Sequence, residues 1–467
     1  MNDLRRKYIG DKAFYAAVFA IIVPLIIQQG ITQFVNLLDN VMVGRLGTAP
    51  MSGVAIVNQI MMVFNLTIFG GLSGASIFGA QFYGKGDQQG LRDTFRFRVM
   101  FCVAMCVIGI VVFLRFGEPL FKMYLNEEAS GAAEIADTLQ SCRAYTRIML
   151  WGLLPFALGQ CYSSALRDTG ETFSPMVASV IAILVNLVLN YLLIFGSFGF
   201  PRMGVAGAAL ATVISRYLEA LYLIANTYRK LDRFPFLRGV FKSLKIPLPL
   251  VKRIAKTGAP LLANETLWSL GIAMINMCYS SRGLTAVAAV NINATVSGLF
   301  SIMLMAQGNA MGIMSGQLLG AGEIDRAKDT VRKLLFFGVT SNALIGLILI
   351  GTAPLIPHIY NTEPVVRETA SRLLMICGMI LPINSYANGS YFTIRSGGKT
   401  FITFLFDCVF TWVVSLSIAY VLSSFTGMSV VWMYFFVEAA NIIKCVIGAL
   451  ILRSGIWARN VVEDVGN

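Results

Sequence analysis

A stripe of polar side chains runs along the first apolar segment of the chain. Its members recur every three to four positions, which places them on one face of a helix. They are Gln28, Gln29, Thr32, Gln33, Asn36, Asp39 and Asn40. Carboxylate and amide oxygens coordinate hard cations, and a partly buried carboxylate can carry a proton near neutral pH. We therefore predict that Asp39, the only acid of the stripe, binds a proton or a cation together with Gln33 and Asn36.

Other apolar segments carry polar groups of the same kind. A charge that faces lipid costs roughly 2.5–3.5 kcal/mol on insertion scales, so such groups are expected to face an interior. The further candidates for a cation site are Asn186, Asn190, Thr212, Glu265 and Asn384. The amides have an equally good structural explanation, because amides can hold helices together. For the acids Asp39 and Glu265, their position within apolar segments favours a functional role.

The remaining charges within apolar segments are interpreted as structural. Arg216 and Glu219 are one helical turn apart, which predicts that they pair. Asp407, Glu438 and Lys444 have no partner that spacing identifies, and Asp407, well inside its apolar run, remains a secondary candidate for a functional role. The 8 cysteines show no metal-ligand spacing, so the only metal expected is Na⁺. No nucleotide-binding or hydrolytic motif is recognisable, which predicts a protein that is not an enzyme, has no cofactor and uses an ion gradient.

The composition of the chain predicts which kind of element positions these residues. Of the 467 residues, 56% are apolar and 13% are charged, whereas soluble chains carry about 25% charged residues. This predicts a protein that crosses the membrane many times, and it excludes a disordered chain, a disulfide scaffold and a secreted enzyme. A spanning helix needs about 20 apolar residues. Twelve such runs lie near residues 14–38, 54–80, 98–116, 145–166, 174–197, 204–226, 258–280, 285–314, 334–357, 373–394, 401–424 and 428–452.

The basic residues predict the orientation of these runs. Most of the 37 Lys and Arg residues fall on one side when the N-terminus is assigned to the cytoplasm and the loops alternate. We therefore expect both termini in the cytoplasm and the chain in the cytoplasmic (inner) membrane. In the most basic loop, Pro235, Pro247 and Pro249 oppose a long helix. The predicted organisation is an N-terminal six-helix lobe (1–228), a basic cytoplasmic linker (229–257) and a C-terminal six-helix lobe (258–467).

The two halves of the chain repeat each other. At one constant offset Gly84-Lys85-Gly86-Asp87 matches Gly320-Ala321-Gly322-Glu323, Pro24 matches Pro260, and Gln81 matches Gln317. Six runs separate the copies, so both halves have the same orientation, which is typical of transporters whose two bundles rock around a cavity. A duplicated channel without alternating access is the alternative. The predicted fold class is an all-α integral membrane protein with twelve transmembrane helices in two pseudo-symmetric six-helix bundles.

A set of short motifs extends over nearly the whole chain. The motifs are Pro24, Gln33 to Gly47, Gly53 to Gln59, Gly84 to Asp87, Ala165 to Gly170 and Met203 to Ala209, with counterparts in the second half. Together they resemble the multidrug and toxic compound extrusion (MATE) family, in particular its bacterial NorM-like and DinF-like members. The resemblance implies an exporter of organic cations, drugs and other amphipathic xenobiotics that is driven by inward flow of H⁺ or Na⁺.

The resemblance also implies roles for single residues of the first half. In the DinF-like branch the acid that matches Asp39 couples the ion, and its partners match Asn186 and Thr212. This chain has Asn190 where a second acid is usual. From the sequence itself, Pro24 lies before the polar stripe and is predicted to bend the first helix.

The NorM-like branch implies a different residue in the second half. The acid that is functional there matches Glu265, whereas Asn384 stands at the place of the second acid. The chain thus has one acid of each pattern and lacks the second of each. The resemblance therefore leaves open whether H⁺ or Na⁺ is the coupling ion and which lobe binds it.

These observations lead to one hypothesis and two rivals. Charged Asp39 would hold a cationic substrate, and H⁺ or Na⁺ entering from outside would neutralise it and release the drug. One rival is a flippase for lipid-linked oligosaccharide or another amphiphile, which should show basic residues in its cavity. The other rival is a receptor or channel without transport of organic solutes. The expected partners are small organic cations or amphipathic drugs and membrane lipid, with no nucleic acid, and the expected state is a monomer.

Overall fold

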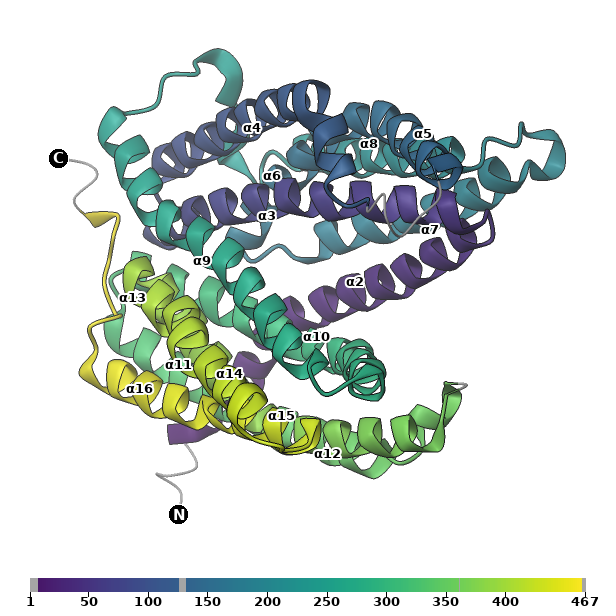
Figure 1. Cartoon of the computed structure of the whole chain (residues 1–467). Coiled ribbons are helices and arrows are strands. Elements are labelled where there is room, and N and C mark those ends of the chain that lie inside the picture. The colour runs from purple at the N-terminus through teal and green to yellow at the C-terminus, as the bar shows by residue number, and fades with distance from the viewer. Residues whose placement is uncertain (1–6, 126–131, 361, 464–467) are drawn as a thin grey trace. The chain divides into compact units, whose positions relative to one another are not determined.

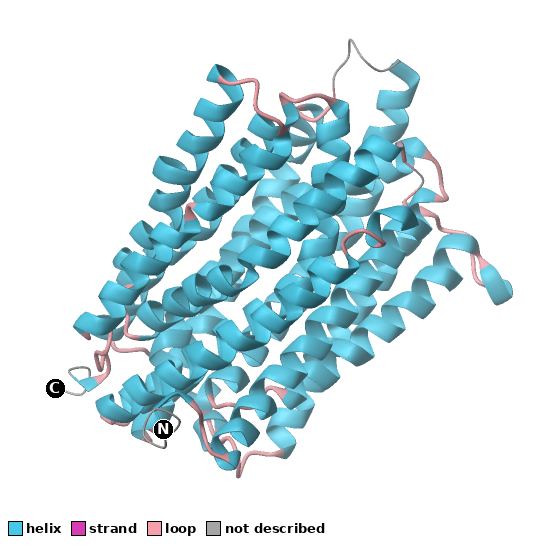
Figure 2. Ribbon diagram, turned by 90° about the horizontal axis from the view of Figure 1, so that it is seen from below, coloured by secondary structure: helices cyan, strands magenta, loops and turns pink. Residues whose placement is uncertain are grey.

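The structure is a computed structural model that describes residues 7–125, 132–360 and 362–463; the side chains of residues 36, 37, 40, 41, 48, 132 and 134 also lie outside the description. Its residues form helices joined by turns, with no strand in the described ranges (Figures 1 and 2). The helices are α2 (Lys12–Gly44), α3 (Thr48–Lys85), α4 (Gln88–Lys122), α5 (Ala132–Met149), α6 (Leu153–Asp168), α7 (Phe173–Phe195), α8 (Val205–Arg229), α9 (Leu248–Ser280), α10 (Leu284–Gly320), α11 (Ile324–Thr352), α12 (Pro364–Ser396), α13 (Thr400–Phe404), α14 (Leu416–Phe425), α15 (Val430–Ala439) and α16 (Asn441–Ser454). The predicted all-helical membrane fold is confirmed.

Each predicted apolar run coincides with a helix or with a broken helix. The run 145–166 covers the end of α5, a 3₁₀ turn at Leu150–Gly152 and α6, and two π-helical turns, Leu405–Val409 and Thr411–Ser415, separate α13 from α14. By length and composition, ten segments within the described ranges can cross a membrane. The α5–α6 segment and α9 are not among these ten. The first is interrupted, and α9 begins with several basic residues and carries Glu265.

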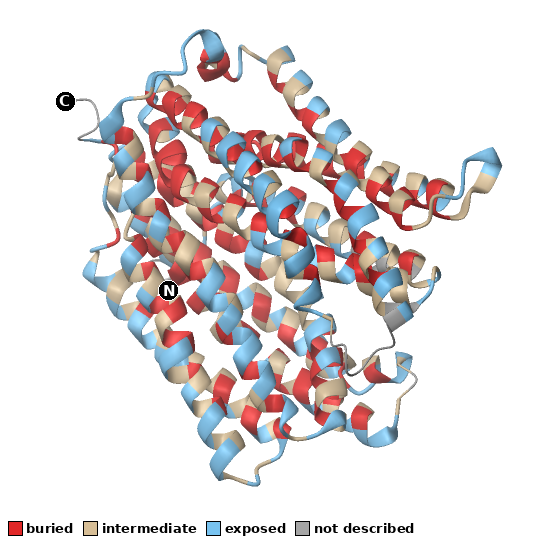
Figure 3. Cartoon of the chain, turned by 45° about the horizontal axis from the view of Figure 1, so that its top comes forward, coloured by how far each residue is buried: buried red, intermediate tan, exposed pale blue. Residues whose placement is uncertain are grey.

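Many residues along the helices are exposed (Figure 3), and large apolar residues are among them. In α4 these include Val107, Ile108, Val111 and Leu114, and Leu114 is 73% exposed. Water would penalise an apolar surface of this extent, whereas the hydrocarbon core of a bilayer accepts it. These faces are therefore the lipid-facing surfaces of a protein that crosses the membrane many times.

The helices divide into two compact units. We call Ile27–Gly79 with Gln88–Val251 the N-terminal unit, and Met1–Ile26 with Ala80–Asp87 and Lys252–Asn467 the C-terminal unit. The N-terminal unit is built on contacts of α8 with α5, α6 and α7, and the C-terminal unit on α10, α11 and α12. The lobe boundaries predicted from the sequence stay a prediction.

The division between the units falls within α2. This helix continues through Pro24, yet the residues up to Ile26 pack in the C-terminal unit and those from Ile27 in the N-terminal unit. In the C-terminal unit Val18 and Ile22 belong to a core with residues of α10 and α11. Proline lacks an N–H, so the helix has one hydrogen bond fewer near this division. The predicted bend at Pro24 stays a prediction.

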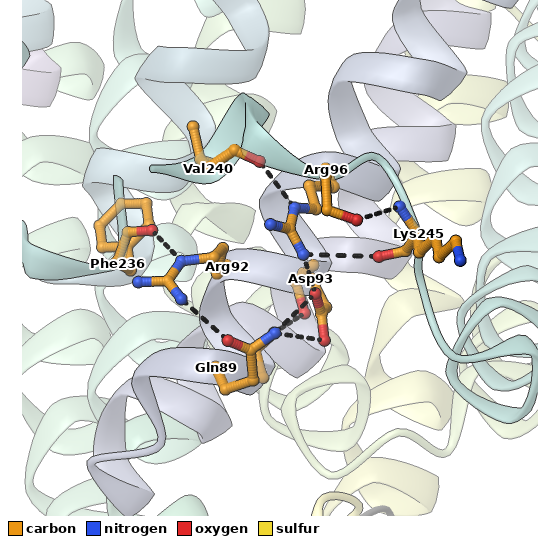
Figure 4. A network of polar contacts seen from close by, with 10 residues as sticks. Gln89, Arg92, Asp93, Arg96, Phe236, Val240 and Lys245 are labelled. Atoms are coloured by element: carbon orange, nitrogen blue, oxygen red, sulfur yellow. Dashed lines mark hydrogen bonds and ion pairs between the residues drawn. The ribbon is translucent and has the colours of Figure 1, made fainter. Parts of the chain in front are cut away.

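The basic linker is held against the start of α4 within the N-terminal unit (Figure 4). Arg92 Nε donates to the Phe236 carbonyl at 3.0 Å, and Arg96 Nε donates to the Val240 carbonyl at 2.7 Å. Arg96 also pairs with Asp93 at 2.8 Å. Most of the linker contains only short 3₁₀ turns, as its prolines predict, but α9 already begins at Leu248. Proline is tolerated in the first turn of a helix, which explains why Pro249 does not delay that start.

Gln81 holds the segment around Arg459 and Val461 inside the C-terminal unit. The side-chain nitrogen of Gln81 donates to the carbonyls of Ser396 and Arg459 at 2.9 and 3.1 Å, and its oxygen accepts from the Val461 N–H at 2.7 Å. Trp457 is 1% exposed. The C-terminal segment is therefore an integral part of this unit.

Helices α3 and α10 cross closely beside Gln81. A Cβ added at Gly84 would meet the backbone of Gln317, and a Cβ added at Gly320 would meet the backbone of Gln81. The four residues are two matched pairs of the sequence repeat. The reciprocal contact explains why both copies of the motif have glycine at this position.

Candidate functional site

Three helices of the N-terminal unit bring Asp39 together with three of its predicted partners. Asn190 Nδ2 of α7 donates to Asp39 Oδ1 of α2 at 2.6 Å and to Asn186 Oδ1 at 3.1 Å. Asn186 Nδ2 also donates to Thr212 Oγ1 of α8 at 3.4 Å. Asn186 and Asn190 are one turn apart, so α7 presents both to the same side. We call Asp39, Asn186, Asn190 and Thr212 the Asp39 cluster.

The Asp39 cluster is rich in oxygen acceptors. Asn190 is 2% exposed, and its Oδ1 is buried without a hydrogen-bond partner among the described residues. Turning the Asn186 amide over would place its nitrogen 3.1 Å from Asp39 Oδ2. Amide orientations follow from the surrounding network, so this amide can offer Asp39 a donor or present its oxygen to a cation. The cluster can thus respond to a change of charge at Asp39.

The structure does not bring the other two predicted members of the polar stripe into the Asp39 cluster. Gln33 has an exposed side chain. The side chain of Asn36 lies outside the described part of the structure. Their predicted part in coupling therefore stays a prediction.

A second polar chain links α2, α7 and α8. Gln28 Nε2 donates to Ser179 Oγ at 2.7 Å, and Ser179 Oγ donates to Glu219 Oε1 at 2.6 Å. Arg216 instead lies over the Phe156 ring, 4.8 Å from its centre. The predicted ion pair of Arg216 and Glu219 is absent from the described contacts. The two side chains reach different neighbouring helices, α6 and α7.

The C-terminal unit contains a partly open cavity of about 400 Å³. Its polar wall includes three carboxylates, two basic groups and several amides, and aromatic rings make up much of the rest. The charged residues of the wall are Glu265, Arg395, Asp407, Glu438 and Lys444. Glu265 thus lies in this cavity, as does the predicted site residue Asn384.

Asn384 lies in a network with an acid that sequence reasoning did not assign to a site. Glu438 Oε2 accepts from Asn384 Nδ2 and from Asn441 Nδ2, both at 3.3 Å, and Asn441 also donates to Asn384 Oδ1 at 3.0 Å. Glu438, near the end of α15, and Asn441, at the start of α16, are three positions apart across the turn at Ala440. That spacing was the signal in the sequence that could have identified them.

Asp407 and Lys444 pair in the same cavity. Lys444 Nζ is 2.5 Å from Asp407 Oδ1, and Asn264 Nδ2 donates to Asp407 Oδ2 at 3.2 Å. The two charges come from different helical segments, so the rules for pairs within one helix could not connect them. Each unit therefore has its own set of partly buried acids with amides beside them. Within the described ranges no cluster of three or more His, Cys, Asp or Glu side chains could hold a metal ion.

Comparison with known proteins places this architecture among multidrug transporters. A sequence model of the family MatE matches residues 24–192 and 260–421. The probable multidrug resistance protein NorM of Thermotoga maritima is 24% identical over 443 residues, 94% of this chain and 92% of that protein. The probable multidrug resistance protein YoeA of Bacillus subtilis is 27% identical over 425 residues, 88% of each chain. A crystal structure of MATE in the bent conformation has a TM-score of 0.83 at 17% identity, covers 96% of both chains and has the same fold.

Proposed function

Because the chain belongs to the MatE family of multidrug transporters, we propose that it exports organic cations and amphipathic drugs in exchange for H⁺ or Na⁺. The observation that carries this proposal is the Asp39 cluster. It combines one carboxylate with buried amide and hydroxyl oxygens and an amide oxygen that has no partner among the described residues. Hard monovalent cations prefer such oxygen ligands. Asn190, which donates to Asp39, is suited to stabilise the charged carboxylate when no ion is bound.

The proposed exchange uses the charge of Asp39. Charged Asp39 attracts a cationic drug, and a proton or Na⁺ on the same carboxylate cancels that attraction. At an effective dielectric constant of about 20, one charge at ~4 Å contributes up to ~4 kcal/mol. Losing it weakens drug binding by nearly a thousandfold, since each 1.4 kcal/mol is about a factor of ten. A ligand shifts an equilibrium only by its difference in affinity between two states, and this charge supplies that difference.

The test is ethidium efflux from vesicles that contain the protein, with pH and Na⁺ gradients imposed separately. We expect one of the two gradients to drive efflux and Asp39→Asn to abolish it. The isosteric amide cannot take up a proton, and it brings no charge to bind Na⁺. The gradient that works identifies the ion.

A matched control removes a different acid from the same unit. Glu118 pairs with Arg143 at 2.8 Å on the surface, and Glu118→Gln should leave efflux unchanged. Full efflux by a well-expressed Asp39→Asn protein would disprove the role of Asp39. Gradient collapse without movement of ethidium would indicate a channel, and movement of labelled lipid without ethidium would indicate a flippase.

A further inference from the structure

The ammonium group of Lys444 is fixed inside the cavity of the C-terminal unit. Its nitrogen is 2.5 Å from Asp407 Oδ1, and it lies 5.4 and 5.7 Å from the ring centres of Phe406 and Phe410. The Lys444 and Asp407 side chains are only 12% and 18% exposed. The pair is thus shielded from solvent, and the two rings add cation–π attraction.

Asp407 is held in place by an unusual turn and by a neighbouring helix. It lies in the π-helical turn Leu405–Val409. Such turns are rare and occur frequently at functional sites. Its second carboxylate oxygen accepts from Asn264 Nδ2 at 3.2 Å. The carboxylate therefore keeps its position through contacts other than the one with Lys444.

The amide that contacts this carboxylate has an unsatisfied oxygen. Asn264 lines the cavity and is 2% exposed, and its Oδ1 is buried without a hydrogen-bond partner among the described residues. Tyr391 also lines the cavity, and its hydroxyl is 3.4 Å from Asn264 Nδ2. The amide nitrogen of Asn264 faces both Asp407 and Tyr391, so turning the amide over would direct its unsatisfied oxygen at them. The carboxylate, the amide oxygen and the phenolic oxygen would then be ligands that suit a hard monovalent cation. The one charge that such a cation would supply is already present as the Lys444 ammonium.

We propose that Lys444 is a tethered cation, which occupies the monovalent-cation position beside Asp407 and keeps Na⁺ out of it. Without the ammonium, Asp407 and the turned-over amide of Asn264 form a site that takes one Na⁺. The inference rests on the proposed function and deepens it in one respect, because it leaves Na⁺ no place at Asp407 in the natural protein.

The experiment measures equilibrium binding of radioactive Na⁺ to purified full-length protein. All variants carry Asp39→Asn, which removes the proposed coupling acid and separates this test from that of the proposed function. Lys444→Met, of similar length but neutral, is expected to bind one more Na⁺ per chain than the Asp39→Asn parent. Adding Asp407→Asn to Lys444→Met should remove that extra Na⁺.

Two controls keep the outcome interpretable. Lys444→Arg retains the positive charge and is expected to bind no extra Na⁺. Na⁺ gained at another acid of the cavity, Glu265 or Glu438, would persist when Asp407 is also neutralised, so the double variant identifies it. Methylammonium, which has the chemistry of the missing group, should compete with Na⁺ for the Lys444→Met protein.

The result that overturns the proposal is a folded Lys444→Met protein without extra Na⁺, or extra Na⁺ that persists when Asp407 is also neutralised. Removing one partner of a buried ion pair is destabilising, so Lys444→Met could fail to fold without added cation. Purification in Na⁺ should then recover it, and purification in choline should not. Equal loss in both salts also counts against the proposal.

Discussion

At the scale of single residues, Asn190 is the most informative member of the Asp39 cluster. Its nitrogen is 2.6 Å from Asp39 Oδ1, and its oxygen has no partner among the described residues. An amide at this position supports a charged Asp39 without adding a second negative charge. The cluster therefore has a single acid with which to bind and release an ion.

Asn190→Asp should tighten ion binding at the Asp39 cluster. Two carboxylates this close cannot both be charged without a proton or cation between them. We expect the concentration of the coupling ion at half-maximal ethidium efflux to fall about tenfold, which corresponds to ~1.4 kcal/mol. Efflux kinetics at varied external pH or Na⁺ measure this change. Asn186→Ser, which keeps an oxygen but adds no charge, is the control, and an unchanged half-maximal concentration in Asn190→Asp would contradict the prediction.

Contacts between site residues could be predicted from the sequence where the two residues share a helix or match a family motif. The i, i+4 spacing put Asn186 and Asn190 on one face, and the resemblance linked them to Asp39. The pair of Asp407 and Lys444 could not be found, because its members are on separate segments and one lies in a π-helical turn. Spacing rules assume regular helices and neighbours in sequence, and this pair meets neither condition.

At the scale of helices, the crossing of α3 and α10 gives structural meaning to a repeated motif. The sequence showed that Gly84 and Gly320 correspond, but not that their helices touch. Contact between distant helices depends on tertiary packing, which a pattern within one helix does not contain. The structure adds that each glycine faces the backbone of the partner helix.

Gly320→Ala should destabilise the protein. Its Cβ would meet the Gln81 backbone, which has no flexible side chain that could move away. Overpacking of this kind typically costs about 1–3 kcal/mol, so we expect a lower melting temperature in detergent. Gly84→Ala should behave alike, because its contact is the reciprocal one.

The control for this substitution lies on the same helix. Gly298 of α10 has open space where a Cβ would be added. Since alanine is the better helix former by up to about 1 kcal/mol, Gly298→Ala should leave the melting temperature unchanged or raise it. Equal melting temperatures for Gly298→Ala and Gly320→Ala would show that the crossing is not tightly packed.

At the scale of the whole molecule, the distribution of basic residues predicts the topology. Most Lys and Arg residues lie on the side assigned to both termini. Such residues resist translocation, so we expect both ends in the cytoplasm. A green fluorescent protein fused after Asn467 should fluoresce, and alkaline phosphatase fused there should be inactive. The same fusions placed after Ser281, in the loop between α9 and α10, should give the opposite result, and phosphatase activity at the C-terminus would refute the topology.

The number and type of helices could be predicted because each run of apolar residues carries its own signal. The division into compact units could not, since it does not follow chain order. Met1–Ile26 and Ala80–Asp87 pack with the second half of the chain rather than with their neighbours in sequence. Hydropathy reports where a helix lies along the chain, and it contains no information on which helices pack together.

This division sets the order in which the two units can be completed during synthesis on the ribosome. Every residue of the N-terminal unit has been synthesised once Val251 is in place, whereas the C-terminal unit needs Trp457 and Val461 near the very end. At about 5–20 residues per second, the stretch Lys252–Asn467 takes roughly 10–40 s to translate. During that interval the start of α2 and the end of α3 are already in the membrane, but the helices they pack against have not yet been synthesised.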